Sequence, residues 1–261
     1  MKKTLIALFA LSGMAMAADT LTLYDQWTFD KNLASTHNRT FIAQNASASF
    51  SGGAMQLTLN NGAVSGIHLN DSNTLDLDSN WALQLTCTIP VGNSSKTAQV
   101  LTCLNNVDGG TQLAIANQGD GGVYGFAGTQ NWAGWGANNR ANTVAAINTP
   151  MVLTLMNYNG DLYLAQNDGW ATFGNGTDHV SDSQVGDMKL RKLTLGFGRN
   201  GTNGLAAQTI TVDNLSVYTF DPLKVQVAQV KSALMSNVPE PTTGSLSLLA
   251  LAGLCARRRK H

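Results

Sequence analysis

The sequence predicts an all-β protein, an antiparallel β-sandwich followed by a C-terminal helix and a short apolar tail. Three observations support this fold class. Short runs of β-branched or alternating apolar residues recur between residues 21 and 218. Turns rich in Gly and Asn separate these runs, as in residues 60–62 and 159–161. The first clear helix signal comes only at residue 221. Many short strands with regular turns are typical of a sandwich or jelly roll.

The expected strands cover residues 21–24, 55–59, 66–69, 82–89, 99–104, 111–116, 123–127, 151–156, 162–166, 192–197 and 208–218. In the fourth of these, Leu83, Leu85 and Cys87 alternate with polar residues, so this strand should have one face in the core. The helix signal is Asp221 followed by proline, with apolar residues at helical spacing up to residue 237. Segment 221–237 is expected to pack on the domain or to form a stalk.

The N-terminus predicts a secretory signal peptide, residues 1–17. Lys2 and Lys3 precede an apolar run (residues 4–11), and a small-x-small site ends at Ala17. The run is shorter than the roughly 20 residues that cross a bilayer, so it is expected to be cleaved rather than to anchor the chain.

The C-terminus, residues 238–261, has three parts in order. The motif Val238, Pro239, Glu240, Pro241 precedes an apolar run (246–256) and a basic end (257–260). The basic cluster favours the cytoplasmic side of a membrane, with the bulk of the chain across it. This segment resembles the PEP-CTERM sorting signals of Gram-negative bacteria. The resemblance implies a membrane-associated precursor in the inner membrane, processing by exosortase, and a location in the cell envelope or at the cell surface. An ordinary tail anchor is the alternative.

The domain between these segments, residues 18–220, is acidic. The chain has 16 basic and 16 acidic residues, and removing two N-terminal lysines and four basic tail residues leaves 10 against 16 in the whole of the remaining chain, a net charge of −6 for the exported part. No basic stripe remains, so nucleic acid is not an expected partner. Of the three cysteines, Cys87 and Cys103 face an oxidising compartment after export. They form either a disulfide or two buried thiols.

Four segments in order resemble the laminin-G-like or concanavalin A-like jelly rolls. These are residues 24–30 (YDQWTFD), 150–167, 193–198 and 212–218 (VDNLSVY), and the resemblance spans residues 19–220. It implies a possible Ca²⁺ site, for which the matching acidic residues are Asp30 and Asp213. The alternative is that both aspartates are simply exposed to solvent.

Catalysis is not expected from the residues present. Retaining glycosidases need two nearby carboxyl groups, and the resemblance implies a strand of pattern Glu-x-Asp-x-(x)-Glu. Glu240 is the only glutamate of the chain, so that pattern is absent. Asp76 and Asp78 could share a strand face, but they alternate with leucines as on a half-buried strand. The histidines are scattered, without zinc-ligand spacing.

A ligand could bind at residues 124–140, where aromatic residues occur among glycines. Aromatic rings offer flat apolar faces and amides supply donors and acceptors, a combination that suits sugars. The alternative is that Trp132 and Trp135 close one end of the core. Trp27, Trp81 and Trp170 lie next to strands and are expected in the core. The candidate ligand residues are Tyr124, Phe126, Trp132, Trp135, Asn138, Asn139 and Arg140.

The sequence therefore predicts an exported, non-catalytic module that binds glycans or extracellular matrix. A glycoside hydrolase-like enzyme and a purely structural envelope protein are the alternatives.

Overall fold

The computed structural model describes residues 20–60, 65–88, 98–106, 109–117, 122–129, 143–144, 149–173, 176–181, 190–196 and 208–238. Its strands are β1 Thr22–Trp27, β2 Phe41–Gln44, β3 Ala46–Ser51, β4 Ala54–Leu59, β5 Gly66–Leu69, β6 Trp81–Thr88, β7 Ala98–Asn106, β8 Gly109–Asn117, β9 Gly122–Thr129, β10 Thr143–Val144, β11 Met151–Tyr158, β12 Asp161–Gln166, β13 Gly169–Trp170, β14 Val180–Ser181, β15 Lys192–Leu195 and β16 Gln208–Thr219. The helices are the 3₁₀ turn η1 Asp71–Asn73 and the α-helix α3 Val227–Ser236.

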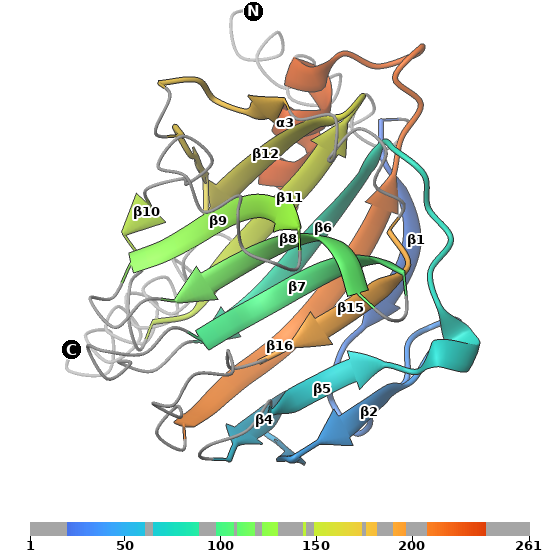
Figure 1. Cartoon of the computed structure of the whole chain (residues 1–261), viewed down its shortest axis with the longest axis vertical. Helices are drawn as coiled ribbons and strands as arrows, with labels where there is room; N and C mark the ends of the chain where they lie inside the picture. The colour runs from blue at the N-terminus through green and yellow to red at the C-terminus, as the bar shows by residue number, and fades with distance from the viewer. Residues whose placement is uncertain are drawn as a thin grey trace, which may run out of the picture.

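The strands of the described residues form two antiparallel sheets that face each other (Figure 1). The nine-stranded sheet has the order β13-β12-β11-β6-β16-β4-β3, with β1 paired to β16 and β14 to β12. The seven-stranded sheet has the order β10-β9-β8-β7-β15-β5-β2. Sequence neighbours often lie in different sheets, which is the connectivity of a jelly roll. The predicted all-β antiparallel sandwich is confirmed.

Strand β6 shows why this sequence builds a sandwich. Leu83, Leu85 and Cys87 are fully buried and belong to the main core between the sheets. Thr86 and Thr88 lie on the opposite face and are half-buried. The predicted alternation is thus confirmed, with one departure: Gln84, which we expected to face water, is 6% exposed. Its burial follows from the helix that covers this face.

The hairpin expected in residues 150–167 is formed by β11 and β12. Their register runs from Leu153 opposite Gln166 to Tyr158 opposite Asp161. The two connecting residues, Asn159 and Gly160, have positive φ angles of 52° and 91°. This is the backbone of the type I′ turn that a right-twisted hairpin favours, and Asn-Gly is its preferred sequence.

Helix α3 packs on the outer face of the nine-stranded sheet, near β11 and β12 (Figure 1). Val230 and Leu234 are fully buried there against Met156 and Phe220. Of the two expectations for this segment, packing on the domain is therefore the one observed. The helix begins later than the Asp221 signal indicated, at Val227, and Asp221 instead accepts a hydrogen bond of 3.0 Å from the Leu223 amide in the preceding turn.

The tryptophans expected in the core divide in two groups. Trp27 and Trp81 are fully buried between the sheets. Trp170 was expected there too, but it lies half-buried on the outer face, beside α3.

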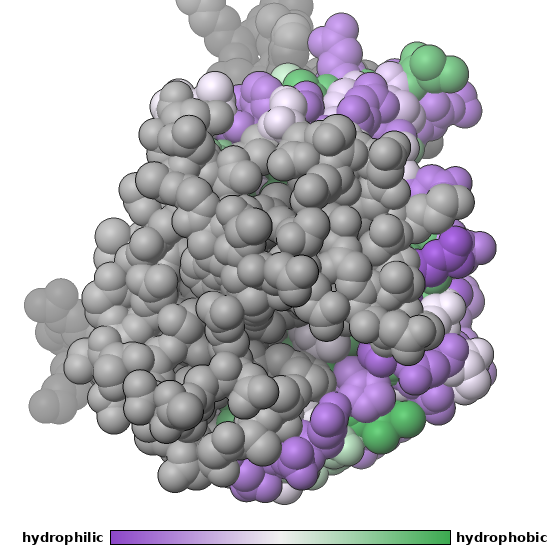
Figure 2. All heavy atoms as spheres, in the orientation of Figure 1, coloured by the Kyte–Doolittle hydropathy of each residue, from purple (hydrophilic) through white to green (hydrophobic). Residues whose placement is uncertain are grey.

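The described surface in the view of Figure 2 is mostly hydrophilic, with small separate apolar areas. Among the described residues the exposed large apolar side chains are Leu23, Ile42 and Leu223. Scattered single residues of this kind are normal on protein surfaces, so the described part of the surface shows no large apolar patch that would need a partner to cover it.

Candidate functional site

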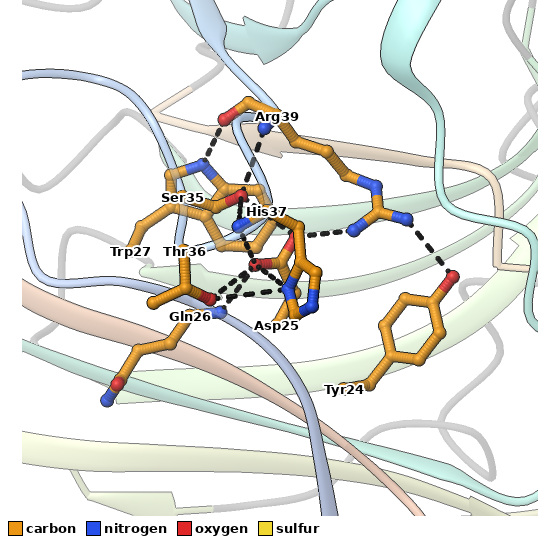
Figure 3. Close-up of polar contacts among 8 residues, drawn as sticks. All are labelled: Tyr24, Asp25, Gln26, Trp27, Ser35, Thr36, His37 and Arg39. Atoms are coloured by element: carbon orange, nitrogen blue, oxygen red, sulfur yellow. Dashed lines mark hydrogen bonds and ion pairs between the residues drawn. The ribbon is translucent and has the colours of Figure 1, made fainter.

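The densest polar cluster of the described residues surrounds Asp25 of β1 (Figure 3). Arg39 Nη1 lies 2.7 Å from Asp25 Oδ2, and Ser35 Oγ donates to the same oxygen at 2.9 Å. Thr36 Oγ1 donates to Oδ1 at 3.0 Å, and the Gln26 amide does so at 2.8 Å. Arg39 also donates to the Tyr24 hydroxyl at 3.2 Å. The cluster ties the loop between β1 and β2 to the start of the domain.

Asp25 is fully buried, yet its carboxylate stays charged. Burial alone would raise the pKa of Asp25, but the hydrogen bonds from Arg39, Ser35, the Gln26 amide and Thr36 outweigh it and hold that pKa below its ordinary value. Both carboxylate oxygens are thus occupied by neighbouring donors. An acid or base that takes part in catalysis needs an accessible oxygen, which this arrangement does not offer.

Ser35, His37 and Asp25 are the residue types of a hydrolytic triad, but their connections differ from one. In a triad the histidine lies between the nucleophile and the acid. Here the Ser35 hydroxyl donates to Asp25 directly, and His37 Nδ1 lies 3.2 Å from the other carboxylate oxygen. The cluster therefore positions a loop and does not activate a nucleophile.

The sequence-predicted ligand residues fall in two groups. Tyr124 and Phe126 belong to β9 of the seven-stranded sheet, where they are two positions apart and so share one face of the strand. The other five lie outside the described residues: Trp132, Trp135, Asn138, Asn139 and Arg140.

The pairing of the seven-stranded sheet extends from Phe126 across six strands. Phe126 is opposite Ala114, which is opposite Thr102, and the row continues through Thr194 and His68 to Ile42. The neighbours of Thr194 and His68 along their strands are core leucines and isoleucine with at most 1% exposure. By alternation the side chains of Thr194 and His68 point to the outer face of the seven-stranded sheet, away from the core, although Thr194 is only 5% exposed there.

A charged group lies on the same outer face, two residues before Thr194. Lys192 is largely buried, and its Nζ lies 2.6 Å from Asp71 Oδ1 of η1. The hydrogen bond from Lys192 outweighs burial and holds the pKa of Asp71 below its ordinary value, and the electrostatic effects of Lys192 and His68 act in the same direction as this bond. No local pattern indicates this ion pair, because Asp71 and Lys192 are 121 residues apart along the chain.

The predicted Ca²⁺ ligands are placed as follows. Asp30 is exposed just beyond β1, and its Oδ1 lies close to Gly53 of the β3–β4 turn. Asp213 is half-buried at the irregularity of β16 between Val212 and Asn214, where desolvation raises its pKa above the ordinary value. No group of three or more His, Cys, Asp or Glu side chains suited to a metal occurs among the described residues. Two carboxylates alone supply fewer oxygens than the six to eight of a Ca²⁺ site.

Cys87 is a free, fully buried thiol, so the bridge to Cys103 is not formed in this structure. The two residues lie on different sheets, Cys87 in β6 and Cys103 in β7. Burial, and to a smaller extent Asp213, raises the pKa of Cys87 to about 12. A thiol that stays protonated does not act as a nucleophile at neutral pH.

Asp76 and Asp78 lie on one side of their segment, both exposed, while Leu75 and Leu77 are buried. Asp76 forms an ion pair of 2.6 Å with Arg191. The alternation that the sequence indicated is confirmed, and these aspartates face solvent rather than a cleft.

Of the sorting motif, Val238 is described and continues the end of α3, where its amide donates to the Met235 carbonyl at 3.1 Å. The rest of the motif, Pro239, Glu240 and Pro241, lies outside the described residues. No helix in the described part of the chain has the length and apolar character of a membrane crossing.

Comparison with solved structures identifies the fold as a concanavalin A-like jelly roll. Domain 4 of AbnA, a GH43 extracellular arabinanase from Geobacillus stearothermophilus solved with arabinotriose, gives a TM-score of 0.54 at 14% identity, covering 82% of this chain and 98% of its own. The laminarinase catalytic domain from Thermotoga maritima MSB8 gives 0.58 at 11%, covering 77% and 99%. SCLam, a non-specific endo-β-1,3(4)-glucanase of family GH16, gives 0.58 at 9%, covering 77% and 92%.

Residues 237–260 match the PEP-CTERM protein-sorting motif. This match confirms the resemblance seen at the C-terminus and marks the chain as an exported protein directed to the cell envelope. The comparison with curated proteins found no match.

Proposed function

We propose that this envelope protein carries a non-catalytic jelly-roll module that binds glycans on the outer face of its seven-stranded sheet. The observation that supports it is the row of register partners from Phe126 to Ile42. Six strands at about 4.8 Å spacing span about 24 Å, the length of a short oligosaccharide. The row has an aromatic residue, Phe126, at one end and an aliphatic residue, Ile42, at the other. Two threonines and a histidine lie between them, with Thr194 the least accessible of the described members at 5% exposure. Sugar rings, with an apolar face and a fringe of hydroxyls, suit such a row.

The structural neighbours give the proposal a ligand class. One was solved with arabinotriose, and others are named as glucanases or laminarinases. This protein shares their fold at low sequence identity, so the identity of its own ligand has to be inferred from its own residues. Plant and algal β-glucans, arabinan and matrix glycans are therefore the first probes.

Replacing Phe126 with alanine is expected to weaken glycan binding on the order of tenfold, since a ring stacked on a partner contributes about 1 kcal/mol. The measurement is calorimetric titration of residues 18–238 with laminarin, mixed-linkage β-glucan, arabinan and sialylated oligosaccharides. Leu23→Ala is the matched control, because Leu23 is a large exposed apolar residue in β1 of the other sheet. That variant should bind as the parent does.

The same titrations separate the alternatives. Release of reducing sugar that is lost on Asp76→Asn would establish a hydrolase and contradict the proposal. Silence across the whole panel would favour a purely structural envelope protein. Binding that Phe126→Ala and Tyr124→Ala leave unchanged would move the site away from this face.

We also propose Ca²⁺ binding near Asp30 and Asp213, with backbone carbonyls supplying the remaining oxygens. Calcium is expected to raise the melting temperature of the parent, and Asp213→Asn should abolish that rise. Without calcium the variant should be at least as stable as the parent at pH 7. The reason is that burial raises the pKa of Asp213, so its ionised form destabilises the fold at any pH above that pKa. Differential scanning calorimetry with calcium or chelator tests this, and an unchanged melting temperature in the parent would contradict it.

The two ends complete the proposal. Residues 1–17 direct export of the chain in a Gram-negative bacterium, and the tail holds the precursor in the inner membrane until an exosortase-type enzyme processes it. The sorting-motif match supports the processing step. Mass spectrometry of the protein from cell envelopes tests both, since it reads the mature N-terminus and C-terminus directly.

A further inference from the structure

We infer that helix α3 is a latch that restrains the sorting motif, and that Lys231 positions this latch on the domain. The inference rests on the proposed processing of the tail and adds a means of regulating it. Its basis is the direct continuity of α3 with the motif: the helix ends at Ser236, and the matched motif begins at residue 237. No linker separates the folded domain from the segment to be processed.

The first two residues of the motif take part in the helix end. The Asn237 amide donates to the Leu234 carbonyl at 3.2 Å, and the Val238 amide donates to the Met235 carbonyl at 3.1 Å. These bonds close the last turn of α3. While the helix is docked, the chain is therefore held by hydrogen bonds up to the residue before Pro239.

Apolar contacts and one amide hold the C-terminal half of the helix. Val230 and Leu234 are fully buried against the outer face of the nine-stranded sheet. Gln84 of β6 is also buried, and its Nε2 donates to the Leu234 carbonyl at 3.0 Å and to Thr154 Oγ1 at 3.2 Å. Undocking the helix would expose both apolar side chains and break the first of these bonds.

Lys231 anchors the helix from its side. Its Nζ lies 4.2 Å from the centre of the Tyr163 ring and 4.8 Å from that of Trp170. The same atom lies 2.6 Å from Asp178 Oδ2. His179 completes the group, since its ring packs on Tyr163 and its Nδ1 lies 2.8 Å from the other Asp178 oxygen. The contacts of the Lys231 ammonium group with two rings and a carboxylate should stabilise the docked helix. The side chain of Lys231 is only 16% exposed, and such contacts are stronger where water is excluded.

The docked helix limits what a processing enzyme can take hold of. Such an enzyme breaks a peptide bond of the tail. The acyl carbon first forms a bond to the nucleophile of the enzyme, while the amine of the broken bond leaves with the proton of that nucleophile. The acyl group then passes to water or to another amine, which returns a proton to the nucleophile. Enzymes that act on peptides commonly bind several residues in extended form on both sides of that bond. The three or four residues before Pro239 include the end of α3. They can adopt the extended form, which covers about 3.3 Å per residue, only if the last turn of the helix unwinds. Undocking should therefore precede efficient processing.

Lys231→Met tests the latch, because methionine keeps an unbranched side chain that is one atom shorter and removes the charge. Precursor and processed forms are followed by pulse–chase labelling of the full chain in cells that contain the processing enzyme. The variant should be processed faster, on the order of tenfold, since loss of the ion pair and the ring contacts shifts the docked–undocked equilibrium by about that factor. Asp178→Asn, which changes the sheet side of the same contact, should act in the same direction.

Lys224→Met is the matched control, because Lys224 precedes α3, has a side chain that is 79% exposed and forms its ion pair with Asp221, three residues earlier in the same turn. It should be processed as the parent is. Equal processing rates in the parent, Lys231→Met and Asp178→Asn would overturn the latch while leaving processing itself established. If the parent is never processed, the proposed function of the tail fails instead. Circular dichroism of each purified variant checks that the sandwich is intact, so faster processing cannot be attributed to an unfolded domain.

Discussion

Replacing Asp25 with alanine is expected to lower the free energy of unfolding by about 3–5 kcal/mol, as removing one partner of a buried ion pair does. Asp25 is fully buried, and the side chain of Arg39 is 20% exposed. Without the carboxylate, the guanidinium keeps its hydrogen bond to the Tyr24 hydroxyl but loses its charged partner, and the Ser35 and Thr36 hydroxyls lose this acceptor. The loop between β1 and β2 should loosen as a unit.

Asp76→Asn provides the control for this prediction. Asp76 and Arg191 lie 2.6 Å apart, a separation close to the 2.7 Å of the Asp25–Arg39 pair, but the Asp76 side chain is 71% exposed. Exposed pairs contribute about 0–1 kcal/mol because water screens the attraction. Chemical denaturation of both variants at pH 7 therefore separates the effect of burial from that of distance. Equal losses in the two variants would contradict the assigned role of Asp25.

The same residue predicts how stability depends on pH. Because the pKa of Asp25 is lower in the folded state than in the unfolded state, ionised Asp25 stabilises the fold above the unfolded value of about 3.9. That contribution is lost as the pH falls through the lower, folded-state pKa. The difference in unfolding free energy between the parent and Asp25→Ala should thus be constant near neutrality and shrink in acid. Denaturation curves from pH 7 to pH 2.5 measure it.

The sequence predicted the strands whose pattern is local. β6 and the β11–β12 hairpin carry alternating apolar residues or an Asn-Gly turn, and both occur where expected. It did not predict β2 and β3. Apart from Phe50, β3 (ASASFS) consists of small residues that alternate between half-buried and exposed at the edge of its sheet, so little in its composition marks it as a strand. Pairing with β4 defines it, and pairing is not visible in a local window.

The polar groups were harder to predict for the same reason. Asp25 and Arg39 are 14 residues apart, and nothing in the spacing distinguishes them from other charged residues of the domain. Gln84 was expected in water, because the pattern of β6 alone does not reveal that a helix 150 residues later covers it. Tyr124 and Phe126 could be selected from composition, but only the register of six strands relates Phe126 to Thr194 and His68.

Removing residues 221–238 is the second change with a large expected effect. Residues 18–220 should be less stable than residues 18–238 by about 3–6 kcal/mol, since two fully buried aliphatic side chains, Val230 and Leu234, contribute about 1.5–3 kcal/mol each. The sheet side also loses cover, because Met156 and Phe220 pack against this helix. Urea denaturation of the two fragments, followed by tryptophan fluorescence, measures the difference.

Two single replacements on α3 distinguish packing from mere chain length. Leu234→Ala should cost about 2–5 kcal/mol, as other buried leucines do. Ser232→Ala, at an exposed position of the same helix, should change stability little. If residues 18–220 and 18–238 unfold at the same urea concentration, the helix is a stalk in solution and carries no packing energy. In that case Lys231 could not restrain the sorting motif either, so this measurement tests the physical premise of the latch independently of any processing enzyme.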